Sequence, residues 1–258
     1  MHNGKTYIVT GAASGIGAET CRVLRADGAR VIGIDRHEAE DVDEMYLVDL
    51  SDKDAVVKLV ADLPNDTDGL ANIAGVPPTA PADVVLRVNL VGLRALTEGL
   101  VDKLADGASI VNLASLAGNG WQTGLPQVKR ALALDFDSDI SEFCEVEDLD
   151  SSGRSYFLGK EALLVWTFQN RWTWRDRGIR INAVSPGPVD TPILGDFAAT
   201  LGKRFEENMQ KLERAGTAED IAPAVGFLLS DQSKWIRGTN LAVDGGMSAH
   251  FLSAQHGF

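Results

Sequence analysis

The chain has 258 residues, 45% of them hydrophobic, which is typical of a soluble globular protein with a sizeable core. Its formal net charge of −13 argues against nucleic acid and anionic membrane as partners. No apolar run approaches the length of a membrane-spanning helix, and the N-terminal stretch lacks the pattern of a signal peptide. We therefore expect a cytoplasmic protein.

Short, nearly continuous apolar segments alternate with helical stretches along the whole chain. The predicted strands cover residues 5–10, 29–35, 45–50, 68–75, 108–115, 179–187 and 238–246. The predicted helices cover residues 15–28, 52–62, 84–105, 154–176 and 217–230. Strands without polar alternation suit a parallel sheet buried on both faces. The pattern predicts one α/β domain over residues 1–258, with a doubly wound (Rossmann) seven-stranded parallel sheet and helices on both faces.

Two segments do not fit the alternation, and we interpret both as additions to the single domain. The first is an acidic insertion at about 119–153, and the second is a substrate lid at about 190–214. Eight acidic residues crowd the insertion without a compensating Lys or Arg between 131 and 153, so we expect them to be exposed. They are Asp135, Asp137, Asp139, Glu142, Glu145, Glu147, Asp148 and Asp150.

The spacing of three of these acids suggests a calcium loop, but the rest of the pattern is missing. Ile140 stands where the loop needs glycine, and Val146 stands where it needs glutamate. The four histidines have no paired ligand spacing, and Cys21 and Cys144 have no metal or redox spacing. We predict no metal, and reduced structural thiols.

The first predicted strand runs into the turn "TGAASGIG", which contains Gly11, Gly15 and Gly17. A glycine-rich turn lets the backbone approach a pyrophosphate, and the N-terminus of the following helix favours its negative charge. The spacing G-x-x-x-G-x-G differs from the common dinucleotide motif, but its place between strand and helix favours phosphate binding.

The second predicted strand ends at Asp35, whose carboxylate can accept hydrogen bonds from the ribose of a dinucleotide and would repel a 2′-phosphate. This favours NAD over NADP as the cofactor. Arg36 could attract a phosphate instead, and a capping role for Asp35 is the simpler alternative.

Tyr156 and Lys160 lie four residues apart in a predicted helix, so both side chains share one face. By itself such a pair is usually a surface feature. Its meaning depends on the motifs elsewhere in the chain.

Seven motifs in the right order together resemble the short-chain dehydrogenase/reductase family over essentially the whole chain. They are "TGAASGIG", "DL" at 49–50, "NIAG" at 72–75, "VNLVG" with Asn89, "IVNLAS" ending in Ser115, "SYFLGK" with Tyr156 and Lys160, and "SPGPVDTP". Ile73 replaces the second asparagine of the family's N-N-A-G segment. The resemblance implies an NAD-dependent alcohol dehydrogenase whose catalytic set is Asn89, Ser115, Tyr156 and Lys160.

The resemblance also implies a set of cofactor contacts along the carboxyl edge of the sheet. These residues are Gly11, Ser14, Gly15, Ile16, Gly17, Asp35, Asp49, Leu50, Asn72, Ala74, Gly75, Tyr156, Lys160, Pro186, Gly187, Val189 and Thr191.

The chemistry of alcohol oxidation explains why a phenol would stand beside an ammonium. The cofactor takes the hydride and the protein must take the proton. We expect Lys160 and the positive nicotinamide ring to lower the pKa of Tyr156, which would then be the general acid/base. Ser115 would hydrogen-bond the substrate oxygen. The resemblance implies that Asn89 positions a water between Lys160 and solvent.

The substrate contacts expected from position in the chain include one residue of the insertion and three of the lid. The full set is Ser115, Trp121, Tyr156, Ile193, Leu194 and Phe197. Within the family, "NIAGVP", "KEALLVW" and "WIRGTNLAVDGG" are similar to bacterial members that oxidise coniferyl alcohol.

The expected substrate is therefore an aromatic or allylic alcohol, or its aldehyde or ketone. A 3α-hydroxysteroid dehydrogenase/carbonyl reductase is the alternative, and a non-catalytic NAD-binding regulator is an alternative of another class. In the family the helices near Asn89 and Tyr156 form the usual dimer face. The insertion should cover that face or build a different one, and we expect a homodimer.

Overall fold

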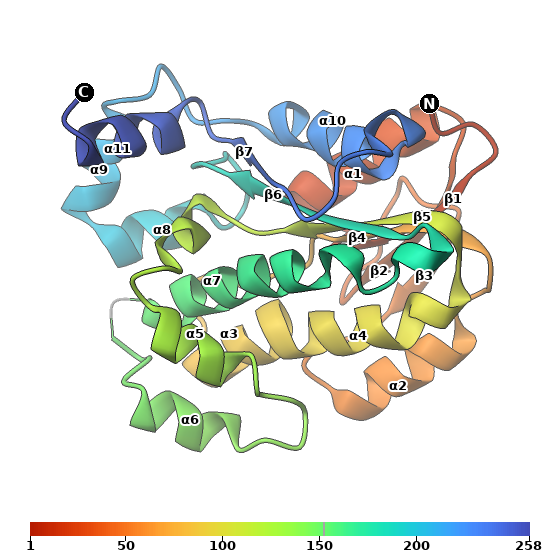
Figure 1. Cartoon of the computed structure of the whole chain (residues 1–258), viewed down its shortest axis with the longest axis horizontal. Helices are drawn as coiled ribbons and strands as arrows, with labels where there is room; N and C mark the ends of the chain where they lie inside the picture. The colour runs from red at the N-terminus through yellow and green to blue at the C-terminus, as the bar shows by residue number, and fades with distance from the viewer. Residues whose placement is uncertain (152) are drawn as a thin grey trace.

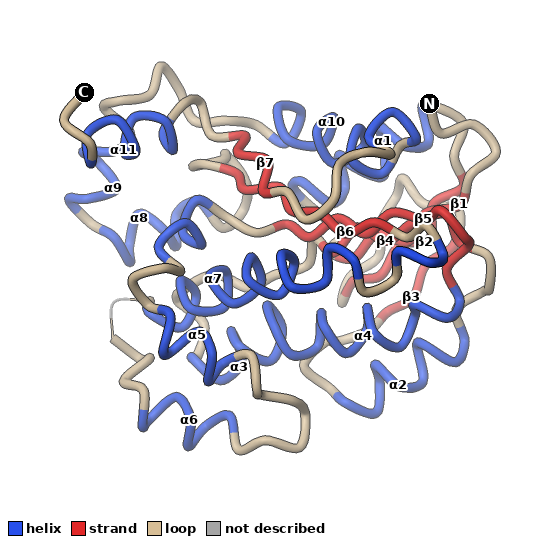
Figure 2. Tube along the Cα trace, viewed as in Figure 1, coloured by secondary structure: helices blue, strands red, loops and turns tan. Residues whose placement is uncertain are grey.

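The computed structural model describes residues 1–151 and 153–258, which form a seven-stranded parallel sheet in the order β3-β2-β1-β4-β5-β6-β7 (Figures 1 and 2). The strands are β1 (Thr6–Thr10), β2 (Arg30–Asp35), β3 (Glu44–Leu47), β4 (Thr67–Asn72), β5 (Leu104–Leu113), β6 (Arg180–Pro186) and β7 (Asn240–Val243). Each lies within or close to its predicted segment, so the doubly wound sheet is confirmed.

Helices cover both faces of this sheet. The face drawn uppermost in Figure 1 carries α1 (Gly15–Ala26) and α10 (Ala218–Leu229). The opposite face carries α2 (Lys53–Asp62), α4 (Leu93–Leu100) and α7 (Arg154–Gln169). Short 3₁₀ turns, η2 (Val101–Lys103), η4 (Asn170–Trp172), η5 (Arg175–Arg177) and η6 (Asp231–Ser233), join these elements.

The alternation of side chains along the strands builds two hydrophobic cores. Ile8 and Ile110 point into the core beneath α4 and α7, whereas Val9 and Val111 point into the core beneath α1 and α10. Successive strand residues face opposite sides, so a continuous apolar run fills both cores. This is why the strands of the sequence are apolar without alternation.

The strand order reverses between β1 and β4, which both lie at the centre of the sheet. In doubly wound folds the crevice at the carboxyl ends of such strands is the usual ligand site. The turn after β1 and the segments after β4, β5 and β6 meet at this edge.

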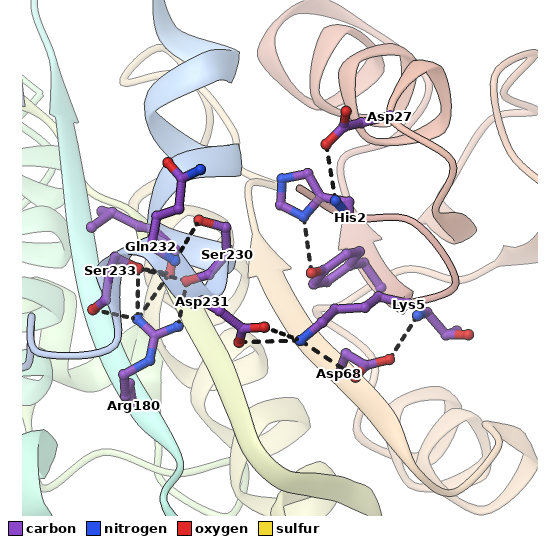
Figure 3. Close-up of polar contacts among 12 residues, drawn as sticks. His2, Lys5, Asp27, Asp68, Arg180, Ser230, Asp231, Gln232 and Ser233 are labelled. Carbon is purple, nitrogen blue, oxygen red and sulfur yellow. Dashed lines mark hydrogen bonds and ion pairs between the residues drawn. The ribbon is translucent and has the colours of Figure 1, made fainter.

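The amino edge of the sheet is held together by polar contacts instead (Figure 3). The buried Arg180 guanidinium donates to the carbonyls of Leu228 and Ser230 at 3.1 and 3.0 Å, just where α10 ends. It thereby satisfies carbonyl groups that a helix terminus leaves without partners. Lys5 pairs with Asp231 at 3.1 Å on the same edge. We assign this edge to stability, because it lies opposite the crevice.

The insertion is folded and packs against the rest of the domain. Its helices α5 (Leu125–Ala131) and α6 (Ile140–Val146) contact α7 and α3 (Ala82–Leu86), respectively. Val128 and Ile140 share one apolar cluster with Leu158 of α7. The insertion therefore covers part of the face of α3 and α7, and its expected part in a subunit interface stays a prediction.

The acidic residues of the insertion are exposed as expected, apart from one that is half-buried. That residue, Glu147, accepts two hydrogen bonds from the guanidinium of Arg130. The Arg130 guanidinium compensates the charge of this carboxylate, which explains why Glu147 can be partly buried.

The lid forms two short helices, α8 (Leu194–Leu201) and α9 (Lys203–Met209), neither of which contains a buried residue. A last helix, α11 (Met247–Gln255), lies beside them, and its Phe251 ring is 5.4 Å from the Lys211 ammonium. Among the residues described, no helix is both long and apolar enough to cross a membrane.

Candidate active site

Ser115, Tyr156 and Lys160 line one cavity of about 1240 Å³ at the carboxyl edge of the sheet. Tyr156 and Lys160 come from α7, and Ser115 follows β5 directly. The Ser115 hydroxyl also accepts a hydrogen bond from the Ala117 amide at 3.1 Å, which caps the 3₁₀ turn η3 (Leu116–Gly120). This hydroxyl is thus both a cap and part of the cavity wall.

Lys160 is buried, with only 3% of its surface exposed, and its ammonium donates to the carbonyl of Leu113 at 2.7 Å. Burial lowers the pKa of Lys160 to about 8, because the charged form loses its hydration. The hydrogen bond to the Leu113 carbonyl, at the end of β5, fixes the position of the Lys160 ammonium.

Burial raises the pKa of Tyr156 to about 12, and the nearby Ser115 hydroxyl only partly opposes this. Burial is the larger influence in the protein without cofactor, and the expected lowering by Lys160 together with the nicotinamide ring stays a prediction. Both groups are buried, and the lysine is directed at the Leu113 carbonyl. A further positive charge in the cavity would lower this pKa, because it favours the phenolate.

Asn89 lies in a π-helical segment, η1 (Arg87–Gly92), between α3 and α4. Its side chain accepts from the Val76 amide at 2.8 Å and donates to the Val76 carbonyl at 3.0 Å. It thus holds the chain that follows β4. A β-carbon added at Gly75 would lie 3.2 Å from the Asn89 oxygen and 3.9 Å from the Lys160 nitrogen. Such π-helical turns often occur at functional sites, and the expected water beside Asn89 stays a prediction.

The glycine turn after β1 is too tight for side chains. A β-carbon at Gly17 would stand 1.9 Å from the Gly11 carbonyl oxygen, and one at Gly11 would stand 2.8 Å from the Ala74 nitrogen. Ser14 and Gly15 follow in this turn, as the N-cap and the first residue of α1. This cradle fits the pyrophosphate of a dinucleotide, as the sequence predicts.

The carboxylate of Asp35 lies beside this turn, at the end of β2. It accepts hydrogen bonds from the amides of Ala13 at 3.1 Å and of His37 at 3.1 Å. The Arg36 guanidinium is 3.9 Å from the carboxylate of Asp49. The cation that could attract a 2′-phosphate is thus close to an acid, which agrees with the preference for NAD over NADP.

The segment after β4 is held by Thr10, whose hydroxyl accepts from the amides of Ile73 and Ala74 at 3.0 Å each. The side chain of Asn72 points into the core, where it donates to Thr97 and Asn112 at 2.9 Å each. Asn72 therefore braces neighbouring elements, and its side chain is not part of the cavity wall.

The predicted cofactor residues divide into two groups. The predicted residues outside the cavity lining are Gly11, Ser14, Gly15, Gly17, Asp35, Asp49, Leu50, Asn72 and Ala74. The predicted residues that line the cavity are Ile16, Gly75, Tyr156, Lys160, Pro186, Gly187, Val189 and Thr191. The second group surrounds the place where the reactive end of a dinucleotide would lie.

All predicted substrate residues line the same cavity. The ring of Phe197 on α8 packs edge-on against Tyr156, with the ring centres 5.0 Å apart. Trp121 of the insertion packs in the same way against Phe168 at 6.0 Å. Ile193 and Leu194 add apolar surface at the start of the lid.

The sequence analysis missed two parts of the cavity wall. Helix α11 contributes Met247, Phe251 and Leu252, although its short sequence has no motif that signals a binding role. A polar part of the wall contains Arg154 and Glu161 of α7, together with Gln127 of the insertion. The spacing of Arg154 and Glu161, two helical turns apart on one face, was the available signal.

Within residues 1–151 and 153–258, no group of three or more His, Cys, Asp or Glu side chains is placed to hold a metal ion. The acids that resemble a calcium loop have local roles. Asp139 caps α6 by accepting from the Glu142 amide at 2.9 Å, and Asp135 accepts from the Asp137 amide at 2.9 Å.

Two family models match the chain: "short chain dehydrogenase" over residues 5–126, and "Enoyl-(Acyl carrier protein) reductase" over residues 151–248. The coniferyl-alcohol dehydrogenase of Pseudomonas sp. (strain HR199 / DSM 7063) is 38% identical over 96% of this chain and 98% of its own. The 3-alpha-hydroxysteroid dehydrogenase/carbonyl reductase of Comamonas testosteroni is 28% identical over 94% of this chain and 96% of its own.

A similar solved structure is that of the 3-alpha-hydroxysteroid dehydrogenase from Pseudomonas sp. B-0831, complexed with NADH. It has a TM-score of 0.81 and 34% sequence identity, and the match covers 96% of this chain and 98% of that one.

Proposed function

The chain belongs to the short-chain dehydrogenase/reductase family and is an NAD-dependent dehydrogenase, and from this premise we propose that its substrate is an aromatic or allylic alcohol. The observation that carries the proposal is the combination, in one cavity, of Ser115, Tyr156 and Lys160 with an aromatic wall. That wall includes Trp121 and Phe197.

NAD⁺, when bound, would supply a hydride acceptor for the carbinol carbon and a positive charge that favours the phenolate. Tyr156 takes the hydroxyl proton of the alcohol as the carbonyl forms, so one hydride and one proton leave the substrate. Ser115 donates a hydrogen bond to the reacting oxygen and holds it near Tyr156. In the reverse direction Tyr156 returns the proton to the carbonyl oxygen.

The positive charge of Lys160 supports this proton transfer. Its ammonium is anchored on the Leu113 carbonyl and lies 5.6 Å from the centre of the Tyr156 ring. Together with the positive nicotinamide ring, this charge favours the phenolate over the phenol. Asn89 accepts a hydrogen bond from the Val76 amide, which holds the segment after β4 against η1.

The aromatic wall supports a flat, unsaturated substrate. Phe157 and Phe251 line the cavity in addition to Trp121 and Phe197. Aromatic rings favour edge-on or offset contacts with other rings, which add to the burial of apolar area. Coniferyl alcohol, named in the relative that is 38% identical, has such a ring and an allylic carbinol.

A 3α-hydroxysteroid is the second candidate, and one observation favours it. The solved structure with a TM-score of 0.81 is a 3-alpha-hydroxysteroid dehydrogenase. A non-catalytic regulator is less well supported, because a binding module has no need of Ser115, Tyr156 and Lys160 together.

We also propose that the protein is cytoplasmic and forms a homodimer. Light scattering on the wild-type protein would test the dimer. Because α5 and α6 cover α3 and α7, a second copy would contact the insertion itself or another surface. The expected result is twice the 27.6 kDa chain mass. A monomer at all concentrations tested would contradict the dimer.

The substrate class is tested by following NADH formation with coniferyl alcohol, cinnamyl alcohol and a 3α-hydroxysteroid. We expect a higher kcat/KM for both cinnamyl-type alcohols than for the steroid. A higher value for the steroid would replace the first candidate by the second. No NADH with any alcohol, although NADH binds, would support the non-catalytic alternative.

A further inference from the structure

A cluster of three polar side chains forms part of the cavity wall and has no role in the hydride transfer described above. The guanidinium of Arg154 donates to the side-chain carbonyl of Gln127 at 2.8 and 2.6 Å. It also donates to both oxygens of Glu161, at 3.0 and 2.7 Å. Only 6% of the Glu161 side chain and 27% of the Arg154 side chain are exposed. We call these three residues the polar cluster.

The polar cluster has a fixed position relative to the catalytic base. Glu161 is five residues beyond Tyr156 on the same helix, which places it about 7.5 Å farther along the axis. Both residues line the same cavity. A ring-bearing alcohol can therefore place its carbinol at Tyr156 and its far end at the polar cluster.

The contacts within the cluster leave bonding capacity for a ligand. They use four of the five N–H groups of Arg154, counted over the part of the chain that the structure describes. Each Glu161 oxygen has a second lone pair. A neutral hydroxyl fits this arrangement, because it can donate to Glu161 and accept from Arg154. A carboxylate on the ligand would be repelled by Glu161, and an ammonium by Arg154.

Attachment of the insertion does not require this cluster. Val128 and Ile140 already pack against Leu158 in a shared apolar cluster. A buried ion pair is a weak source of stability, since apolar side chains of similar volume often serve as well or better. A second pair, Arg130 with Glu147, links α5 to the end of α6 and does not line the cavity.

We propose that Gln127, Arg154 and Glu161 form a recognition subsite for a hydroxyl group at the end of the substrate remote from the reacting carbinol. The inference rests on the proposed function, and it narrows the substrate class to alcohols such as 4-hydroxycinnamyl alcohol, in which a phenolic hydroxyl lies opposite the allylic alcohol. The insertion then has a defined purpose, because it supplies Gln127 and holds Arg154 in place.

The sharpest test compares two alcohols that differ only in this hydroxyl, 4-hydroxycinnamyl and cinnamyl alcohol. Their dissociation constants are measured by calorimetry on the complex of the enzyme with NADH, so the readout does not need turnover. We expect the wild type to bind the hydroxylated alcohol about 10- to 100-fold more tightly, as hydrogen bonds to charged groups imply. Equal binding of the two alcohols, or no binding of either, would overturn the subsite.

The double variant Arg154→Met with Glu161→Leu replaces the pair by apolar groups, a change that buried pairs often tolerate. The double variant should bind the two alcohols about equally tightly. Glu161→Gln should lower the preference for the hydroxylated alcohol only in part. Asp137→Asn is the matched control, because it weakens the ion pair between the insertion and Lys53, away from the cavity and from the polar cluster, and it should keep the wild-type preference. Loss of preference in Asp137→Asn as well would assign the effect to the fold of the insertion and overturn the proposal.

The ratio of kcat/KM for the two alcohols separates this inference from the proposed function. Oxidation of both at the same kcat/KM would leave the proposed function standing and remove the subsite. Tighter binding of the hydroxylated alcohol without any NADH formation would do the reverse.

Discussion

The ammonium of Lys160 lies 5.6 Å from the centre of the Tyr156 ring, and its hydrogen bond goes to the Leu113 carbonyl. The two groups share one buried face of α7, yet burial alone moves both pKa values toward the neutral forms, to about 12 for Tyr156 and about 8 for Lys160. Their chemistry therefore depends on what else enters the cavity. Binding of the positively charged oxidised cofactor would lower the pKa of Tyr156 and allow the phenol to act as an acid/base group.

Tyr156→Phe should lower kcat by about 100- to 10,000-fold, because it removes the proposed general base while the cavity keeps its shape. NADH binding, measured by fluorescence titration, should stay near that of the wild type. Tyr46→Phe is a suitable control, since its hydroxyl donates to Glu44 at 2.7 Å, far from the cavity lining. Substantial turnover in Tyr156→Phe would disprove the assigned role.

Lys160→Met should change how the thermal stability of the apoprotein depends on pH. The pKa of Lys160 is about 8 when folded, against an ordinary value of 10.5. Below pH 8 the lysine is charged in both states, and its burial costs stability in full. Between about pH 8 and 10 the unfolded chain binds more protons, so the wild type gains stability as the pH rises.

The variant lacks this gain. Its melting temperature should exceed that of the wild type at pH 7, and the difference should shrink toward pH 10. A difference that stays constant over this range would show that the lysine is protonated in the folded protein throughout.

Asp35→Ala should weaken NAD binding and narrow the gap between NAD and NADP, because the carboxylate that would bond the ribose and repel a 2′-phosphate is gone. The Ala13 amide also loses its acceptor, so part of the loss would come from a looser turn. Dissociation constants for both cofactors provide the measurement, with Asp41→Ala as an exposed acidic control on the following segment. A wild type that already prefers NADP would contradict the assignment and give Arg36 the larger role.

The lid should be cut by trypsin in the apoprotein and protected by NADH. Lys203 and Arg204 are exposed in a helix that buries no residue, so local opening costs little. A bound cofactor would contact Thr191, just before the lid, and reduce this opening. The exposed turn at Arg175, remote from the cavity lining, serves as the internal reference site. Equal cleavage of the lid with and without NADH would count against a closing motion.

The insertion should be an integral part of the fold. Ile140→Ala should lower the free energy of unfolding by about 2–5 kcal/mol, because this side chain is fully buried between α6 and the body of the domain. Val146→Ala removes an apolar group that is 75% exposed on the same helix and should have little effect. Urea denaturation measures both. Equal, small effects would mean that the insertion unfolds separately.

The sequence predicted those parts of the molecule that depend on local pattern and chain order. Apolar runs such as those around Ile8 and Ile110 belong to strands whichever side they face, and the tight turn at Gly17 admits no other residue. Ser115, Tyr156 and Lys160 could be expected to line one cavity because each of their motifs follows a strand or lies on a helix face.

Features that depend on distant contacts could not be predicted. The raised pKa of Tyr156 follows from burial, to which Phe197 of the lid contributes a ring contact, and the spacing of two residues does not contain it. The C-terminal helix reaches the cavity only because the chain returns past the lid after β7. Likewise, Gln127 meets Arg154 only when the insertion has folded onto α7.

The central position of β1 in the sheet has a consequence for synthesis of the chain. Its partner β4 lies about sixty residues later, with Tyr7 opposite Gly69, and β5 obtains its outer neighbour only when β6 follows, with Ile110 opposite Ile181. Until β6 leaves the ribosome, β5 is therefore an unprotected edge that carries apolar side chains on both faces. Such edges pair readily with other chains. The same long-range pairing that assembles the crevice thus leaves the nascent protein most prone to aggregation just before its last third is made.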